Sequence, residues 1–121
     1  MKFLLSIYGN EETWNSLGPE ETAELISRTD AHNKAQVESG ELLGAFGTSE
    51  PANVRRVRNT DSGRVVTDGP YIESKEYLGS FYLVDCESYD RALEIAAAMP
   101  SADLVDIEVW PLMHGGTADE L

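Results

Sequence analysis

The sequence predicts an α+β domain with a ferredoxin-like arrangement, in which two strand–helix–strand units share one antiparallel sheet and a β-hairpin is inserted between them. The length of 121 residues suits a single domain. Two segments with helical character each lie between segments of strand-like alternation. Between these two units, the turn sequence Thr-Asp-Ser-Gly at 60–63 separates short strand patterns at 53–59 and 64–67, which marks the hairpin.

The first unit begins with residues 2–8, which are apolar on both faces and therefore predict a central strand. A polar loop is expected at 9–18. Pro19 then opens a helix at a favoured first-turn position. This helix is expected to end just before Gly40, which supplies a left-handed cap, and a second strand is expected at 41–47.

The second unit begins with a strand at 78–85, followed by a helix for which Ser88 is the expected N-cap. The helix carries apolar residues at helical spacing and is stopped by Pro100, and a last strand is expected at 104–110. Alternation along 78–85 assigns one face of the strand to Leu78, Ser80, Tyr82 and Val84.

The sheet face that the two helices leave open is expected to carry large side chains. The candidates are Tyr82 or Phe81, Trp110 or Val109, and Tyr8 or Ile7. A large exposed apolar patch usually marks a partner surface. We therefore expect a homodimer whose stacked sheets form a dimeric α/β barrel. A single domain is expected over 1–112, followed by a flexible tail at 113–121.

The composition excludes several classes of protein. The net charge of −13 argues against binding to nucleic acid or to anionic membranes, because both need a basic surface. The single cysteine, Cys86, fits a reducing compartment, and we expect a cytoplasmic protein with no membrane span. No spacing of metal ligands, phosphate loop or dinucleotide motif is present, so neither a metal nor a cofactor is predicted.

Four arginines lie close together in the predicted hairpin: Arg55, Arg56, Arg58 and Arg64. One interpretation is a solvated hairpin whose arginines pair with carboxylates across the strands. The other is a local cationic wall, in which Arg55 and Arg58 bind an anionic small molecule.

The first helix has a polar middle on its expected inward stripe, which consists of Leu25, Ile26, Thr29, Asp30, Asn33 and Val37. Unpaired buried polar groups are costly, so this middle is either exposed or lines a wet cavity in which Asp30 and Asn33 contact a ligand. His32, on the flank of the stripe, is either an ordinary exposed histidine or a group that transfers protons near neutral pH. Because residues i and i+2 point to different sides of a helix, Asp68 is a better partner for His32 than Asp30.

The segment that starts at Asp68 combines a turn with ionisable groups. Asp68 either caps the turn before Gly69 or acts as a general base or histidine-orienting group. Tyr71 either packs or contacts a ligand. Glu73 and Lys75 either belong to a solvated run or project into a cleft from one strand face. The phenols of Tyr8 and Tyr82 pack in the sheet, and their hydroxyls can also bind a ligand carboxylate.

The run Asp-Gly-Pro-Tyr-Ile-Glu-Ser-Lys-Glu at 68–76 resembles the YCII-related family, in its DGPF-motif subgroup. The likeness continues in Leu-Gly-Ser-Phe at 78–81, in Ile-Glu-Val-Trp-Pro at 107–111 and in Gly-Glu-Leu-Leu at 40–43. It spans nearly the whole chain, from Phe3 to Pro111. Ser80 replaces a usual glycine and Trp110 replaces a usual arginine. If that arginine binds a ligand in other members of the family, the ligand here would differ.

The resemblance implies a dimeric α+β barrel. Some relatives are small-molecule lyases or dehalogenases that act on ring-derived acids, with a histidine–aspartate pair proposed as their active site. Two hypotheses follow. The first is a cofactor-independent lyase, isomerase or dehalogenase that acts by proton transfer on a small anionic organic molecule, with Asp68 and His32 as catalytic residues. The second is a non-catalytic ligand-binding or regulatory protein that accompanies an extracytoplasmic-function sigma factor.

Overall fold

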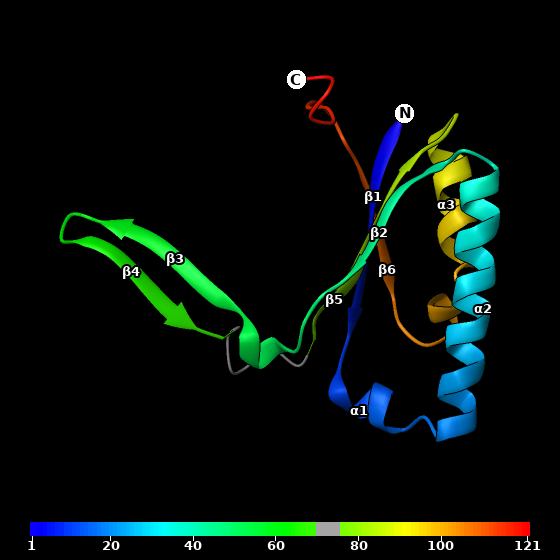
Figure 1. The fold of residues 1–121 in the computed structure, drawn as a ribbon, viewed down its shortest axis with the longest axis horizontal. Helices are drawn as coiled ribbons and strands as arrows, with labels where there is room; N and C mark the ends of the chain where they lie inside the picture. Colours follow the sequence, from blue (N-terminus) through cyan, green and yellow to red (C-terminus); the bar gives the residue numbers. More distant parts are fainter. Residues whose placement is uncertain (70–75) are drawn as a thin grey trace.

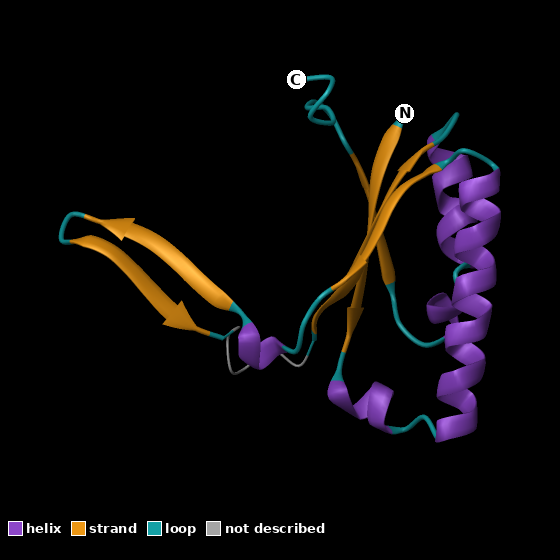
Figure 2. Ribbon diagram, in the orientation of Figure 1, coloured by secondary structure: helices purple, strands orange, loops and turns teal. Residues whose placement is uncertain are grey.

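The computed structural model describes residues 1–69 and 76–121 (Figures 1 and 2). Its elements in chain order are β1 (Lys2–Gly9), α1 (Glu11–Asn15), α2 (Pro19–Glu38), β2 (Leu42–Gly47), η1 (Pro51–Asn53), β3 (Arg55–Thr60), β4 (Gly63–Asp68), β5 (Tyr77–Asp85), α3 (Tyr89–Ala98), η2 (Pro100–Asp103) and β6 (Ile107–Pro111), where η denotes a 3₁₀ turn.

The main sheet has the strand order β2-β5-β1-β6, and every neighbouring pair is antiparallel. Each half of the fold places a helix between two strands that are not neighbours in the sheet, which confirms the predicted ferredoxin-like α+β fold. Helices α2 and α3 both lie on one face of the sheet (Figure 1). The hairpin of β3 and β4 forms a separate two-stranded sheet that extends on the opposite side (Figure 1).

The core lies between the sheet and α3. Its buried side chains are Phe3, Leu5, Ile7, Tyr82, Val84, Cys86, Ala92, Ile95, Ala96 and Met99. The residues of α3 in this set repeat at helical spacing, so the apolar stripe predicted for that helix is confirmed. Full burial of a side chain such as Phe3 or Leu5 contributes about 1.5–3 kcal/mol to the stability of the fold.

The loop predicted at 9–18 contains a short helix, α1. The side chain of Asn10 accepts a 2.7 Å hydrogen bond from the backbone N–H of Thr13, which caps the helix. Glu11 and Glu12 complement the positive helix end. The last strand is also shorter than predicted, because η2 continues from Pro100 and β6 begins only at Ile107.

The face assigned to Leu78 was wrong. The register of β1 against β5 shifts between Ile7 and Tyr8, so that Ile7 lies opposite Ser80 while Tyr8 lies opposite Leu78. This bulge turns Leu78 to the face that carries Tyr8, away from the helices. Ser80, Tyr82 and Val84 keep the predicted orientation towards the helices.

The inward stripe of α2 also differs from the prediction. Ile26 and Val37 are 56% and 62% exposed, and Asp30 is exposed as well. The residues that turn inward are mostly polar: Leu25, Thr29, His32, Asn33 and Gln36. Their spacing still follows one helix face, but only Gln36 on this face is buried and the other four residues are half-buried. The side of α2 that turns inward is thus mostly polar, whereas the sequence predicts a polar middle between apolar ends.

The open face of the main sheet carries Phe81, Trp110 and Tyr8, whereas Tyr82, Val109 and Ile7 pack on the helix side. A shallow hollow on this face is lined by Leu4, Ser6, Tyr8, Leu78, Phe81 and Trp110. The rings of Phe46 and Phe81 lie 5.4 Å apart, and Phe46 remains 56% exposed. Among the described residues, no helix is long and apolar enough to cross a membrane.

Candidate functional site

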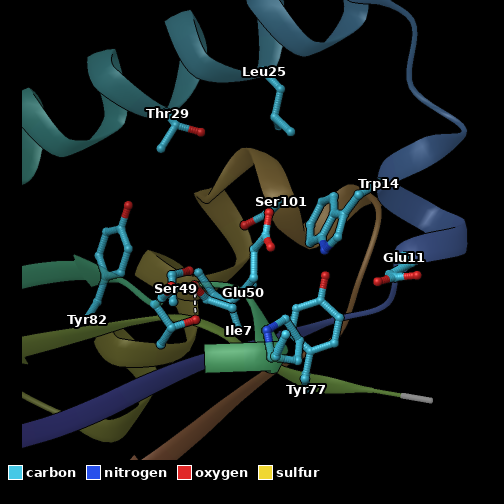
Figure 3. Close-up of a pocket in the computed structure, with 15 residues that line it drawn as sticks. Ile7, Glu11, Trp14, Leu25, Thr29, Ser49, Glu50, Tyr77, Tyr82 and Ser101 are labelled. Atoms are coloured by element: carbon cyan, nitrogen blue, oxygen red, sulfur yellow. Dashed lines mark hydrogen bonds between the residues drawn. The ribbon is translucent and has the colours of Figure 1, made fainter. Parts of the chain in front are cut away.

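A cavity of about 550 Å³ lies between the helices and one end of the main sheet (Figure 3). Its walls come from α1, the first half of α2, the ends of β1 and β5, and the segment 48–52. Together with Ser101 of η2, five separate stretches of sequence therefore meet in one concave space. A second cavity of similar volume lies under the C-terminal tail, but it lacks a comparable set of converging aromatic and acidic side chains.

One wall of this cavity is aromatic and consists of Trp14 and Tyr77, whereas the ring of Tyr82 lies at the other end (Figure 3). The indole of Trp14 lies directly on Gly9, where a β-carbon would overlap the ring. Gly9 lies opposite Tyr77 in the sheet, so the absence of a side chain at Gly9 brings the rings of Trp14 and Tyr77 to the same end of the cavity. The flat faces of these rings suit a planar organic ligand.

The polar groups of the cavity are carboxylates and hydroxyls. Glu11 comes from the first turn of α1, and Glu50 comes from the segment before η1. The hydroxyls belong to Thr29, Thr48, Ser49, Ser80 and Ser101, in addition to the phenols. Among the described residues, no lysine, arginine or histidine lines this cavity. The described lining therefore favours neutral or cationic ligands over anionic ones.

The segment 48–52 is held against β5 by side-chain hydrogen bonds. The hydroxyl of Thr48 lies 2.7 Å from the carbonyl oxygen of Leu78 and 3.1 Å from that of Gly79, and it donates towards them. The side-chain amide of Asn53 donates a 2.7 Å bond to the hydroxyl of Ser49. These contacts position Glu50 at the cavity wall.

Tyr82 connects the cavity to α2. Its hydroxyl donates a 2.8 Å hydrogen bond to Oδ1 of Asn33. Burial, together with the negative charge of Asp30, raises the pKa of Tyr82, so the phenol stays protonated near neutral pH. Because its one proton is directed to Asn33, the oxygen of Tyr82 can only accept a hydrogen bond from a ligand.

A model of the YCII-related domain matches residues 1–113. The protein belongs to the YCII-related family. An uncharacterized protein of Rhizobium meliloti (strain 1021) is 29% identical over 103 residues, which cover 85% of this chain and 83% of that protein. The predicted family is confirmed, and assignment to the DGPF subgroup stays a prediction.

The fold of this YCII-related protein is similar to that of 5-chloro-2-hydroxyhydroquinone dehydrochlorinase (TftG) from Burkholderia phenoliruptrix AC1100, solved in complex with 2,5-dihydroxybenzoquinone. The TM-score is 0.53 at 18% identity, and the match covers 95% of this chain and 96% of that chain. At this identity the likeness concerns the fold.

His32 is half-buried on α2 and does not line the cavity. Burial lowers its pKa, which favours the neutral imidazole. Its buried Nε2 atom has no hydrogen-bond partner among the residues that the structure describes. Asp68 ends β4 on the hairpin side of the sheet, with its side chain 84% exposed (Figure 1). The structure thus does not bring Asp68 and His32 together within one chain.

The other predicted site residues are dispersed. Asp68 forms an ion pair with Arg55, whose Nε lies 3.1 Å from Oδ1, and Arg58 is exposed in β3. Tyr8 faces the open side of the sheet. Asn33 adjoins the cavity through Tyr82, and Asp30 is exposed close by on α2. The remaining three, Tyr71, Glu73 and Lys75, lie outside the described residues.

Sequence reasoning did not select Glu11, Trp14, Glu50 or Tyr77. The signal for the first two was present, because Asn10 followed by two glutamates is a typical helix start. Glu50 and Tyr77 carried no such signal, since their position depends on how the chain returns to the same end of the sheet.

Proposed function

We propose that this YCII-related protein is a cofactor-independent enzyme that binds a small organic molecule in the cavity beside Trp14 and Tyr77 and acts on it by proton transfer. The observation that supports this most directly is a cavity of about 550 Å³ that combines an aromatic wall with two carboxylates. The family and the dehydrochlorinase with a similar fold favour a lyase, isomerase or dehalogenase.

The proposed chemistry needs a base beside the ligand. A carboxylate from Glu11 or Glu50 can remove a proton from a carbon or hydroxyl of the ligand. In an elimination, the electron pair of the bond to the removed hydrogen forms the new double bond. The leaving group departs with the electron pair of the bond that held it to the ligand. The oxygen of Tyr82 can accept a hydrogen bond from a ligand hydroxyl and so orient the ring.

The charge of the substrate is the point on which the sequence and the cavity favour different answers. The sequence predicts an anionic substrate bound by Arg55, Arg58 and Lys75, with Asp68 and His32 as proton carriers. The described cavity lining is acidic and has no cationic side chain. An anionic ligand would therefore need a cation from outside this lining, whereas a neutral phenol needs none.

A ligand screen followed by two sets of variants tests the proposal. We expect phenols and quinones to raise the melting temperature with increasing concentration. Small carboxylates should do so only if cationic side chains from outside the described lining reach the cavity. Glu50→Gln and Glu11→Gln are then compared with Asp68→Asn and His32→Gln in turnover of the best ligand. Loss of turnover confined to the second pair would overturn the assignment of the cavity carboxylates.

The second candidate function is a non-catalytic ligand-binding or regulatory protein that accompanies an extracytoplasmic-function sigma factor. It is favoured by one observation: the described cavity lining holds no imidazole paired with a carboxylate. Saturable binding without turnover for any stabilising ligand, together with association with a purified sigma factor, would favour this function over the enzyme.

We also propose a homodimer formed through the open sheet face and a cytoplasmic location. The first is supported by the exposed aromatic side chains of Phe46 and Trp110 on that face. The second is supported by the unpaired Cys86, which is buried. Sedimentation at increasing dilution tests the dimer, and a lone protomer at all concentrations would contradict it.

A further inference from the structure

The hairpin β3–β4 is entirely exposed. Every residue of both strands is exposed, including Val57, Val65 and Val66 at 66%, 44% and 52%. An isolated two-stranded hairpin is marginally stable in water, because it cannot bury enough apolar surface by itself. Valines on such a hairpin therefore indicate that another surface covers it.

The cross-strand register determines which face of the hairpin is apolar. Val57 lies opposite Val66, so these two side chains share one face and form an apolar pair. Val65 lies opposite Arg58 on the other face, where its neighbour is charged. The face that carries Val57 and Val66 is consequently the better candidate for a contact with another protein surface.

The charge of the hairpin is opposite to that of the rest of the chain. Residues 55–68 contain four arginines and two aspartates, a net charge of +2, which leaves −15 on the rest of the protein. The remainder of a second copy is thus an electrostatically complementary surface for the hairpin. This segment accounts for four of the nine basic residues of the protein.

The position of the hairpin points to the same partner. It extends from the sheet on the side opposite α2 and α3, which is the side of the open sheet face with Phe81 and Trp110 (Figure 1). A second copy that covers this face would lie beside the hairpin. We propose that β3–β4 is an arm that binds a second copy of this chain through the face of Val57 and Val66. The inference rests on the proposed homodimer.

Sedimentation velocity over a dilution series tests the arm with three variants. We expect Val57→Asp combined with Val66→Asp to raise the dissociation constant of the dimer by about tenfold or more, because charge is introduced into an apolar contact. The matched control Val65→Asp places the same charge on the opposite face and should leave this constant close to that of the unchanged protein. Trp110→Asp tests the sheet face separately.

Four outcomes are decisive. Dissociation by the double variant but not by Val65→Asp supports the arm. If Trp110→Asp dissociates the dimer while the double variant does not, the arm is overturned and the homodimer stands. A protein that is monomeric at every concentration overturns both. Binding of a DNA duplex at physiological salt that the double variant abolishes would assign the arm to nucleic acid instead.

Two further measurements guard against a folding artefact. Far-UV circular dichroism of each variant must match that of the unchanged protein, and Val57→Ser with Val66→Ser replaces the aspartate pair if it does not. Hydrogen exchange of the hairpin amides provides a second readout, because these amides should be protected in the dimer and exchange rapidly on dilution. Rapid exchange at dimeric concentrations would contradict the arm.

Discussion

The hydroxyl of Tyr82 donates a 2.8 Å hydrogen bond to Oδ1 of Asn33, and this bond joins the central strand β5 to the polar side of α2. Both partners are partly or fully withdrawn from water. The bond satisfies one of the polar groups that α2 turns inward, while Nε2 of His32 and Oε1 of Gln36 have no partner among the described residues. It also fixes the orientation of the phenol at the cavity.

Tyr82→Phe is expected to lower the free energy of unfolding by about 1 kcal/mol or more, because Oδ1 of Asn33 loses its donor. Ligand affinity should fall as well if the phenol oxygen accepts a hydrogen bond from the ligand. Urea denaturation and ligand titration measure the two effects. The control is Tyr89→Phe, whose exposed hydroxyl donates a weaker 3.3 Å bond to the carbonyl oxygen of Val109. Equal effects of both changes would contradict a special role for Tyr82.

Gly9→Ala is expected to displace the indole of Trp14, because the added β-carbon would overlap the ring. Overpacking of this kind costs about 1–3 kcal/mol of stability. Fluorescence of Trp14, recorded in a Trp110→Phe background, should change in intensity and quenching. Gly47→Ala serves as the control, since no atom lies within 4 Å of the methyl group that it adds and its backbone is not left-handed. An unchanged spectrum for Gly9→Ala would show that Trp14 does not rest on Gly9.

The stability of the fold should depend on pH through Glu41. Its carboxylate accepts bonds of 2.9 and 2.8 Å from Nε and a terminal nitrogen of Arg91, and this pairing lowers the pKa of Glu41 from its ordinary value of 4.5. Because the pKa of Glu41 is lower in the folded state, the pair with Arg91 contributes its full stabilisation above about pH 4.5. This stabilisation is lost as the pH falls through the pKa that Glu41 has in the folded protein.

The melting temperature of Glu41→Gln, compared with that of the unchanged protein between pH 7 and pH 3, isolates this contribution. The difference between the two should be largest near neutral pH and shrink in acid. Glu24→Gln, on the exposed side of α2, is the control and should show little difference at any pH. A difference for Glu41→Gln that persists unchanged at the acid end would contradict the assignment.

Leu5→Ala is expected to lower the free energy of unfolding by about 2–5 kcal/mol, because Leu5 is fully buried in β1 and its removal leaves a cavity. Leu43→Ala, at a position that is 46% exposed, should cost much less. Chemical denaturation measures both losses of stability, provided that the free energy of unfolding depends on denaturant concentration with the same slope in each variant. Similar losses for the two variants would place the centre of the core elsewhere.

Much of the fold followed from local patterns. The stripe of α3 predicted its buried side, Ser88 predicted its start through a 3.1 Å bond from the N–H of Arg91, and Gly40 adopts the expected left-handed conformation with φ of 79°. These features depend on residues within a few positions of one another, so periodicity and capping preferences suffice to predict them.

The residues of the site were predictable only in part. Asn33 was selected from the polar middle of α2 and adjoins the cavity through Tyr82. Trp14 and Glu50 are not predictable in this way, because the pattern at 9–18 predicts a loop and because nothing in the local sequence indicates that the segment before η1 lines the same cavity as α2. The direction of Leu78 was missed because a bulge opposite Tyr8 interrupts the alternation on which it was predicted.

By itself, the sequence determined the order of the strands and of the helices α2 and α3, the family and the acidic character of this protein, since each of these depends on neighbouring residues or on the whole composition. Only the tertiary structure decided that Glu11, Trp14, Glu50 and Tyr77 share a cavity, and that the hairpin that ends at Asp68 and the helix α2 that carries His32 extend on opposite sides of the sheet. Such distances depend on strand register and chain reversal, which bring together residues that no local pattern connects.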